Sequence, residues 1–213
     1  MRIAIPITAE SMDEALRDMD RAAEVADIID LRIDYMANPD LERLLRHSQT
    51  PKIVTNRTRY EGGRFQGTET ERVAYLKQAI DLGAEFVDIE FGHYHPLDRK
   101  NSKLIVSHHN LEETPDNLDG IYASIAEKNP DIVKIVTEAN NHHDSLRMLD
   151  LIAGADKDII GICMGQNGII TRIFGPVYGG YLTFASLGEG KSSAPGQMSA
   201  VKLRQIWQLM QPE

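Results

Sequence analysis

The chain has 213 residues, of which 42% are hydrophobic, so it can bury one sizeable core, and we expect a single domain over residues 1–213. The formal net charge is -9 and the acidic residues are spread along the chain, which indicates solubility and leaves no basic stripe for nucleic acid. The apolar runs are too short for a membrane span or a signal peptide. The sequence therefore predicts a cytoplasmic protein with no nucleic-acid or membrane partner.

Short β-branched runs alternate with stretches of helical apolar spacing, which is the pattern of βα units on a parallel sheet. The predicted strands are residues 2–7, 27–33, 52–56, 86–90, 103–109, 131–136, 158–164 and 181–186. Eight such units predict an α/β fold of the (β/α)8 TIM barrel type. An open doubly wound sheet is the alternative. It is disfavoured because no strand is followed by a glycine-rich dinucleotide fingerprint.

Several helix starts are marked in the sequence between the strands. Thr68 with Glu71 forms a capping-box pair, while Pro39 and Pro115 each stand at a plausible first helical position. The connection "FGHYHPLDRK", residues 91–100, offers at best a distorted helix. We therefore expect one of the eight units to lack a regular helix.

A lysine interrupts one of the predicted strands. Lys134 lies in "PDIVKIV", residues 130–136, where an ammonium group is costly to bury. It could lie on an edge strand and extend its amine to solvent. Alternatively, desolvation favours the neutral amine, which can attack a ketone and form a Schiff base. A nearby Arg57 or Arg172 would disfavour the ammonium form further.

Polar residues gather at or after the predicted strand ends, where a barrel places its active site. They are Asp30, Arg32, Arg57, Glu61, Glu90, His108, His109, Lys134, Arg172, Ser193 and Gln197. His109 is a general acid/base candidate or a histidine bonded to a loop, whereas His108 should point to the opposite face. Glu61 either orients His109 or pairs with Arg57 in an exposed loop. Arg172 is either a surface charge or a guanidinium placed to bind a carboxylate.

The histidines also raise the question of a metal site. Residues 93–95, 108 and 109 could contribute imidazole ligands, but the spacing matches no specific zinc motif. We therefore predict no metal.

Several short stretches at these strand ends carry a resemblance to a known family. They are "DLRID" (30–34), "NRTRYEGG" (56–63), "VDIE" (87–90), "SHHN" (107–110), "DIVKI" (131–135), "MGQNGIITR" (164–172) and "SSAPGQ" (192–197). In this order, over nearly the whole chain, they resemble type I 3-dehydroquinate dehydratase of the shikimate pathway. The resemblance implies a (β/α)8 barrel, commonly a homodimer, that acts on the small molecule 3-dehydroquinate without a metal or organic cofactor.

The resemblance also implies a role for each matching residue. Lys134 would form the imine, His109 would be the general acid/base, and Glu61 would support the histidine. Arg172 would bind the substrate carboxylate, and Asp30 stands where the family is expected to hold the longer Glu. We expect this departure to change a hydroxyl contact and not the reaction. The further residues that match family contacts to the carboxylate or ring hydroxyls are Arg32, Arg57, Ser193 and Gln197.

Two other functions fit the same sequence features. A class I aldolase or transaldolase-like barrel would also use a strand lysine, and it would need a phosphate pocket in the late loops. A barrel that only binds a metabolite or partner is the non-enzymatic alternative. It is disfavoured because Lys134, His109 and Glu61 are all present.

Overall fold

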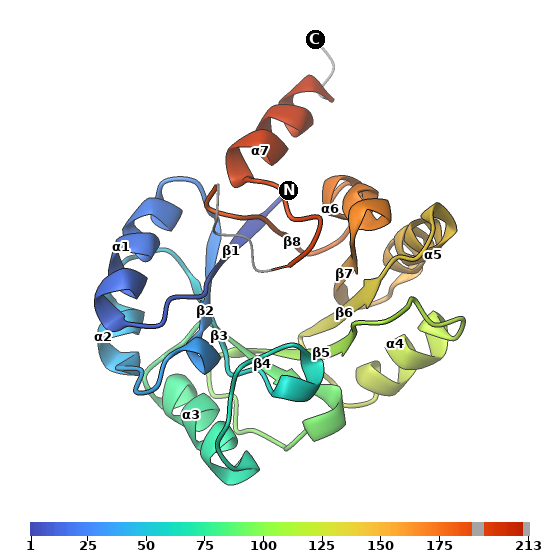
Figure 1. Cartoon of the computed structure of the whole chain (residues 1–213). Coiled ribbons are helices and arrows are strands. Elements are labelled where there is room, and N and C mark those ends of the chain that lie inside the picture. Colours follow the sequence, from blue (N-terminus) through green and yellow to red (C-terminus); the bar gives the residue numbers. More distant parts are fainter. Residues whose placement is uncertain (189–193, 211–213) are drawn as a thin grey trace.

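A computed structural model describes residues 1–188 and 194–210 and shows a ring of parallel strands (Figure 1). Their order in the sheet is β7-β6-β5-β4-β3-β2-β1-β8, so each strand except the terminal pair lies beside its neighbours in sequence. The backbone N–H of Tyr181, just before β8, donates to the carbonyl of Ile159 in β7 at 2.7 Å. This contact brings the two ends of the sheet together and nearly closes the barrel. The strands are β1 (Ile3–Ile7), β2 (Ile28–Arg32), β3 (Lys52–Thr55), β4 (Phe86–Glu90), β5 (Lys103–Asn110), β6 (Ile132–Glu138), β7 (Asp158–Met164) and β8 (Thr183–Phe184).

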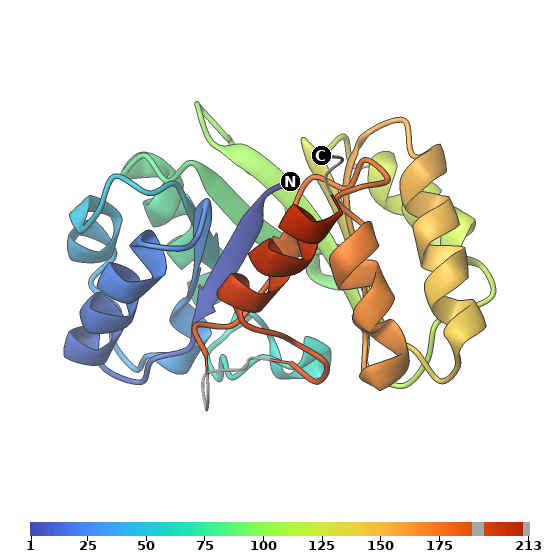
Figure 2. The same ribbon diagram turned by 90° about the horizontal axis from the view of Figure 1, so that it is seen from above.

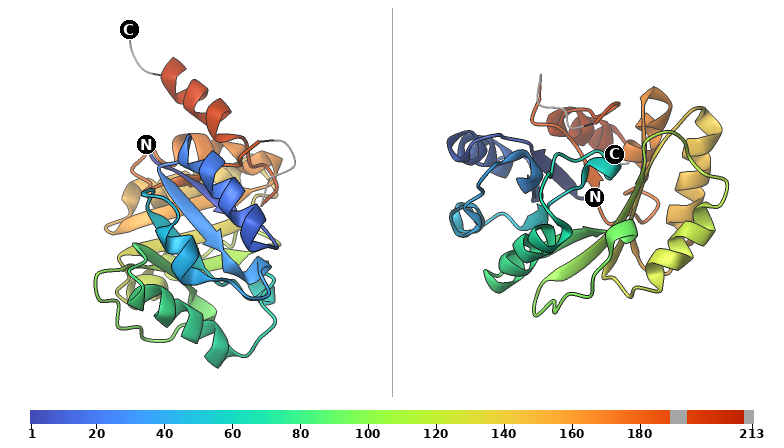
Figure 3. Two further views of the ribbon diagram at one scale, coloured as in Figure 1. Left: turned by 90° about the vertical axis from the view of Figure 1, so that its left-hand side faces the viewer. Right: turned by 60° about the horizontal axis from the view of Figure 1, so that its bottom comes forward.

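Helices cover the outside of this ring (Figure 2). They are α1 (Met12–Ala23), α2 (Leu41–Arg46), α3 (Glu69–Asp81), α4 (Leu118–Ala126), α5 (His142–Gly154), α6 (Ile169–Phe174) and α7 (Ala200–Leu209). The connection from β4 to β5 carries a short 3-10 helix, η3 (Phe91–His93), in place of an α-helix. The predicted (β/α)8 barrel is thus confirmed, including its irregular fourth unit. The end of α7 projects away from the ring (Figure 3).

The predicted helix starts at Pro39 and Pro115 are wrong by two or three residues. Helix α2 begins after the N-cap Asp40, and α4 begins after the N-cap Asn117. In both, the side-chain oxygen of the cap accepts a hydrogen bond from a first-turn N–H, which fixes the start of the helix more directly than proline does. The capping box predicted at the start of α3 is present.

The strands separate two apolar layers. Side chains that point outward pack against the helices, whereas those that point inward fill the barrel, among them Ile28, Phe86, Ile105, Ile132 and Ile160. Successive inward positions lie two residues apart. In β2 to β6 the next inward positions toward the carboxyl ends carry polar groups, namely Asp30, Thr55, Asp88, Ser107 and Lys134, whereas β7 carries the apolar Ile162 there. The barrel therefore has an apolar floor and a polar upper layer.

No helix within the described ranges is long and apolar enough to cross a membrane.

Candidate active site

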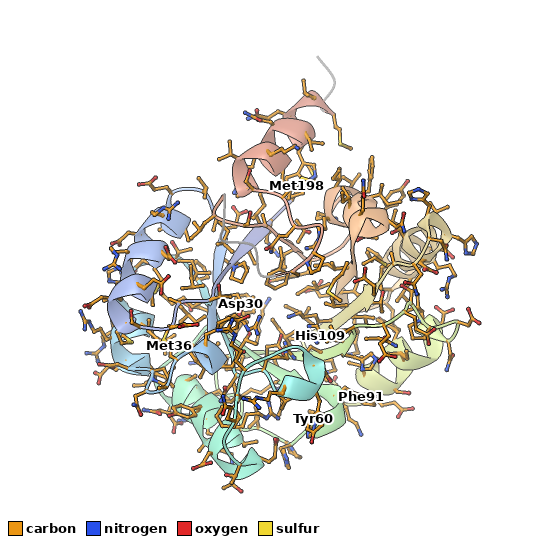
Figure 4. All side chains as sticks on the ribbon, viewed as in Figure 1. Asp30, Met36, Tyr60, Phe91, His109 and Met198 are labelled. Carbon is orange, nitrogen blue, oxygen red and sulfur yellow. The ribbon has the colours of Figure 1, made fainter. Side chains whose placement is uncertain are left out.

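A cavity of about 110 Å³ opens at the carboxyl ends of the strands. Asp30 from β2 and His109 from β5 both face this central space (Figure 4). The residues to which the family resemblance assigns a role line the cavity wherever the structure describes them: Asp30, Arg32, Arg57, Glu61, His109, Lys134, Arg172 and Gln197. Glu90, also expected at this end of the strands, does not line it. Ser193 lies outside the described residues. The fold therefore gathers residues that are far apart in sequence into one site.

Lys134 lies on the inward face of β6, and its side chain is 7% exposed. Strand β6 lies between β5 and β7, so the edge-strand explanation for this lysine is wrong. The amine is 2.9 Å from Asp88 Oδ2 and 4.8 Å from the centre of the Phe184 ring. The ammonium is buried beside a carboxylate, at the wall of a cavity that a small molecule can enter.

Asp88 serves two cations. Its Oδ1 accepts hydrogen bonds from Arg57 Nη2 at 2.8 Å and from Ser107 Oγ at 2.6 Å, while Oδ2 faces Lys134. Burial alone would raise the pKa of Asp88, but the charges of Arg57 and Lys134 hold the pKa well below its usual range. From the sequence, either Arg57 or Arg172 was expected to disfavour the ammonium of Lys134 if it lay nearby. The structure places the ionised carboxylate of Asp88 between Arg57 and Lys134, which offsets that repulsion.

His109 and Glu61 form a hydrogen-bonded pair across the cavity wall. His109 Nδ1 is 2.8 Å from Glu61 Oε2, which also accepts from the backbone N–H of His109 at 3.0 Å. Glu61 ends a 3-10 helix, η2 (Arg59–Glu61), and Gly62 follows it with a φ of 78°, which favours glycine. A Cβ on Gly63 would lie 2.1 Å from the carbonyl oxygen of Arg57. The two glycines allow the turn that carries Glu61 back to the histidine.

Burial displaces the proton affinities of this pair in opposite directions. Burial raises the pKa of Glu61 to about 7, with Arg57 opposing the rise. Burial, followed by the charges of Arg57 and Lys134, lowers the pKa of His109 well below its usual range. Near neutral pH the imidazole is therefore neutral. When Glu61 is ionised it can only accept, so the ring proton lies on Nδ1 and Nε2 is left with a lone pair that can take a proton.

Arg172 extends from α6 into the site and is 2% exposed. Its Nη1 and Nη2 donate to the carbonyls of Phe184 and Pro195, both at 3.3 Å, and its Nε has no hydrogen-bond partner within residues 1–188 and 194–210. Among the described residues, no carboxylate lies within ion-pair distance of this guanidinium. Burial lowers the pKa of Arg172 to about 10, so the group is still a cation at neutral pH. A buried cation that has no carboxylate partner in the described part of the chain is suited to an anionic ligand.

Asp30 and Arg32 form the β2 side of the cavity. Asp30 Oδ1 accepts from Thr55 Oγ1 at 2.6 Å, and burial raises the pKa of Asp30 against the opposing charges of Lys134 and Arg32. Arg32 is held by two hydrogen bonds of 2.8 Å to Asp34, so one edge of its guanidinium is already occupied. The remaining N–H groups of Arg32 are the ones that a ligand can reach.

Asp88, Ser107 and Thr55 were not among the predicted site residues. Each lies inside an apolar strand. There the sequence alone does not distinguish a polar residue of the site from an isolated polar residue in the core. The alternation of inward and outward positions contained the missing signal, since Asp88 shares the inward face of β4 with Phe86. His108 lies one residue from the inward-facing His109 and does not line the cavity, as predicted.

The histidine side chains do not assemble a metal site in the part of the chain that the structure describes. No three His, Cys, Asp or Glu side chains gather closely enough there to hold an ion. The absence of a metal requirement stays a prediction.

Comparisons with known proteins place the chain in one family. Residues 3–213 match the family model for type I 3-dehydroquinase. The chain is 38% identical to a 3-dehydroquinate dehydratase of Methanococcus maripaludis (strain C5), covering 98% of this chain and 100% of the relative. It is 37% identical to a 3-dehydroquinate dehydratase of Methanocaldococcus jannaschii, covering 98% of each.

The fold agrees with this similarity. A crystal structure of 3-dehydroquinate dehydratase from Geobacillus kaustophilus superposes with a TM-score of 0.88 at 25% identity, covering 98% of this chain and 90% of that one. The family model matches nearly the whole chain. Relatives that align over their full length are more than 35% identical to it. The chain belongs to the type I 3-dehydroquinase family.

Proposed function

We propose that this chain converts 3-dehydroquinate to 3-dehydroshikimate and water through an imine on Lys134. The activity follows from membership of a family of dehydratases, which also favours it over the aldolase and the non-enzymatic alternatives. One observation carries the mechanism: the Lys134 amine and the His109–Glu61 pair line the same cavity from neighbouring strands. An amine and a neutral imidazole in that arrangement can divide imine formation and proton transfer between them.

The first stage is imine formation. The Lys134 ammonium first gives one proton to solvent, and the resulting neutral amine attacks the C3 carbonyl of the substrate, which forms the C–N bond of a carbinolamine. The carbinolamine oxygen takes one proton from the attacking nitrogen and regains the proton given to solvent, and it leaves as water, so that a protonated imine remains. Asp88, 2.9 Å from the amine, can neutralise the positive charge of the ammonium before the reaction and that of the imine afterwards. The protonated imine draws electrons from C2 and so makes the C2 hydrogens acidic.

The second stage is the elimination. His109 Nε2 takes a proton from C2, and the electron pair of the broken C–H bond forms the enamine. The enamine expels the C1 hydroxyl, which leaves as water after the histidinium returns a proton to it. Hydrolysis of the product imine releases 3-dehydroshikimate and regenerates Lys134. Glu61 accepts a hydrogen bond from Nδ1 throughout and stabilises the histidinium.

The remaining residues of the cavity are assigned to substrate binding. Arg172 is the group that binds the substrate carboxylate, because it is a buried cation without a carboxylate partner in the described residues. We assign contacts to the carboxylate or the ring hydroxyls to Asp30, Arg32, Arg57, Ser193 and Gln197. The scheme uses no metal or organic cofactor. A cytoplasmic location and a homodimer are part of the same proposal. The location rests on the short apolar runs of the sequence, and the homodimer rests on the family resemblance.

The test is formation of the conjugated enone of 3-dehydroshikimate, followed by absorbance. We expect turnover by the unaltered protein and nearly none by Lys134→Met. Lys103→Met is the matched control, because Lys103 is an exposed lysine at the opposite end of β5 and should leave turnover unchanged. Full turnover by Lys134→Met would remove the imine from the mechanism. Lack of turnover by the unaltered protein would remove the proposed activity.

A further inference from the structure

A second layer of buried charge lies behind the cavity and does not line it. Its centre is Arg72 of α3, whose side chain is 0% exposed. The guanidinium forms two hydrogen bonds to Glu69, at 2.6 and 2.8 Å, and contacts the carboxylate of Glu90. It also donates to the carbonyl of Asn56 at 3.4 Å and to that of His93 at 3.1 Å. One buried arginine thus joins α3 to the segments that follow β3 and β4.

Glu90 continues this connection toward the site. Its side chain is 1% exposed, and its Oε1 accepts from the backbone N–H of Thr58 at 2.7 Å and lies 3.7 Å from Arg57 Nη1. Arg72 holds the carbonyl of Asn56, and Glu90 holds the N–H of Thr58. The backbone is therefore anchored on both sides of Arg57, from groups that a substrate in the cavity does not contact.

The anchored segment carries two of the proposed functional residues. Arg57 reaches Asp88, the partner of Lys134, and Glu61 reaches His109. A shift of this segment would displace the partners of the amine and of the imidazole together. Pre-set geometry of this kind matters to the rate, because misplacing a reacting group by about 1 Å can cost on the order of 10²-fold.

Charge connects the two layers as well. The groups that act on the carboxylate of Glu61 are Arg57, Glu90, Asp88 and the N–H of His109. Arg57 favours its ionised form, whereas Glu90 and Asp88 disfavour it. A cation in contact with Glu90 reduces that repulsion.

We propose that Arg72 and Glu90 are positioning residues for the dehydration. They hold the segment 56–61 so that Arg57 and Glu61 face the reacting groups, and they act through those residues without touching the substrate. This inference rests on the proposed function. It extends the functional set from the cavity wall to helix α3.

The first test compares Arg72→Gln with a matched control. Arg147→Gln removes an arginine that holds another loop in the same way, through the carbonyls of Thr114 and Pro115 and the carboxylate of Asp144, outside the cavity. We expect Arg72→Gln to lower kcat by roughly 10- to 100-fold, while borohydride still traps substrate on Lys134. Arg147→Gln should lower thermal stability and leave kcat within about twofold. Arg72→Lys, which keeps the charge beside Glu90, should recover part of the loss.

The second test uses the pH dependence of kcat/KM. Glu90→Gln removes a negative charge near Glu61 and should move the acidic limb of the profile to lower pH. Arg72→Gln leaves that charge without its cation and should move the limb to higher pH. Loss of fold stability alone would not shift the two limbs in opposite directions. If Arg72→Gln does not fold, Glu90→Gln carries the test alone, since it is isosteric and can still accept from the Thr58 N–H.

Two outcomes would overturn the inference. One is unchanged kcat in Glu90→Gln and in Arg72→Gln. The other is a loss of kcat no larger than that of Arg147→Gln, with acidic limbs that do not move. Either result in a protein whose unaltered form turns over 3-dehydroquinate would leave the proposed function intact. Lack of turnover by the unaltered protein would instead reject the proposed function.

Discussion

Replacing Glu61 by glutamine should stabilise the protein at alkaline pH while slowing its reaction. The Glu61 side chain is 10% exposed, and burial raises its pKa from the ordinary 4.5 to about 7. A tenfold change in proton affinity corresponds to about 1.4 kcal/mol, so the ionised carboxylate costs the folded state about 3 kcal/mol. The amide oxygen of glutamine can still accept from the backbone N–H of His109.

The sign of the effect follows from the raised pKa. Below pH 4.5 the carboxyl is protonated in both the folded and the unfolded chain, so it adds no pH-dependent term. As the pH rises through 4.5 to about 7, the unfolded chain loses the proton first and the folded protein loses stability. Glutamine does not titrate. We therefore compare the free energy of unfolding of Glu61→Gln with that of the unaltered protein. The difference in favour of the variant should be about 3 kcal/mol larger at pH 8 than at about pH 4.5.

The assay is urea unfolding of both proteins at the two pH values, with turnover measured on the same samples. Any constant cost of the substitution cancels when the two differences in the free energy of unfolding are subtracted. Turnover of the variant should fall by roughly 10- to 100-fold, less than the full contribution of a general acid/base, because Glu61 acts through His109. A stability difference that is the same at both pH values would refute the raised pKa of Glu61.

Three further predictions concern the reaction. In the unaltered protein, kcat/KM should fall as the pH drops below about 7, because a protonated Glu61 donates to His109 Nδ1 and leaves the ring proton on Nε2; a profile that is flat from about pH 5.5 to 8 would contradict this. The kcat of His109→Ala should fall by about 10²- to 10⁴-fold, while borohydride still traps the substrate on Lys134. If this variant also lost the trapped adduct, the histidine would be required for imine formation. Arg172→Met should raise KM by roughly 10- to 100-fold, because it removes a charged hydrogen bond of about 1.5–3 kcal/mol. The control is Arg204→Met, which removes an arginine bound to the carbonyl of Val25 and to Asp27 and should not change KM.

Most of the barrel could be predicted from the sequence, because the apolar periodicity of a strand or a helix is a local property of the sequence. Strands β1 to β7 are β-branched runs of the length that a barrel needs, and the irregular fourth unit is visible as a stretch without helical spacing. The eighth strand was predicted over residues 181–186, which contain one β-branched residue, and is limited to Thr183–Phe184 in the structure. Lys134 could be assigned as a candidate because it interrupts an apolar strand, and His109 because it lies at the end of one. The helix starts at Pro39 and Pro115 could not be resolved, since proline before a cap and proline at the first helical position look alike in sequence.

The partners of the candidate residues depend on the tertiary structure. Asp88 meets Lys134 because β4 and β6 both face the barrel axis on either side of β5, and no spacing in the sequence records that distance. Arg72 shows the same limit more strongly. Helix α3 is rich in charged residues, so the sequence predicts that its arginine lies on the surface. The complete burial of Arg72 results from the packing of α3 beside the end of β4.

The most direct test of the account is to trap the imine. The protein is incubated with 3-dehydroquinate and borohydride, its intact mass is measured, and the modified peptide is identified, with Lys134→Met treated in parallel. The account predicts one substrate-sized adduct on Lys134 and none in Lys134→Met. An adduct on another lysine, or full turnover without any adduct, would contradict the proposed role of Lys134.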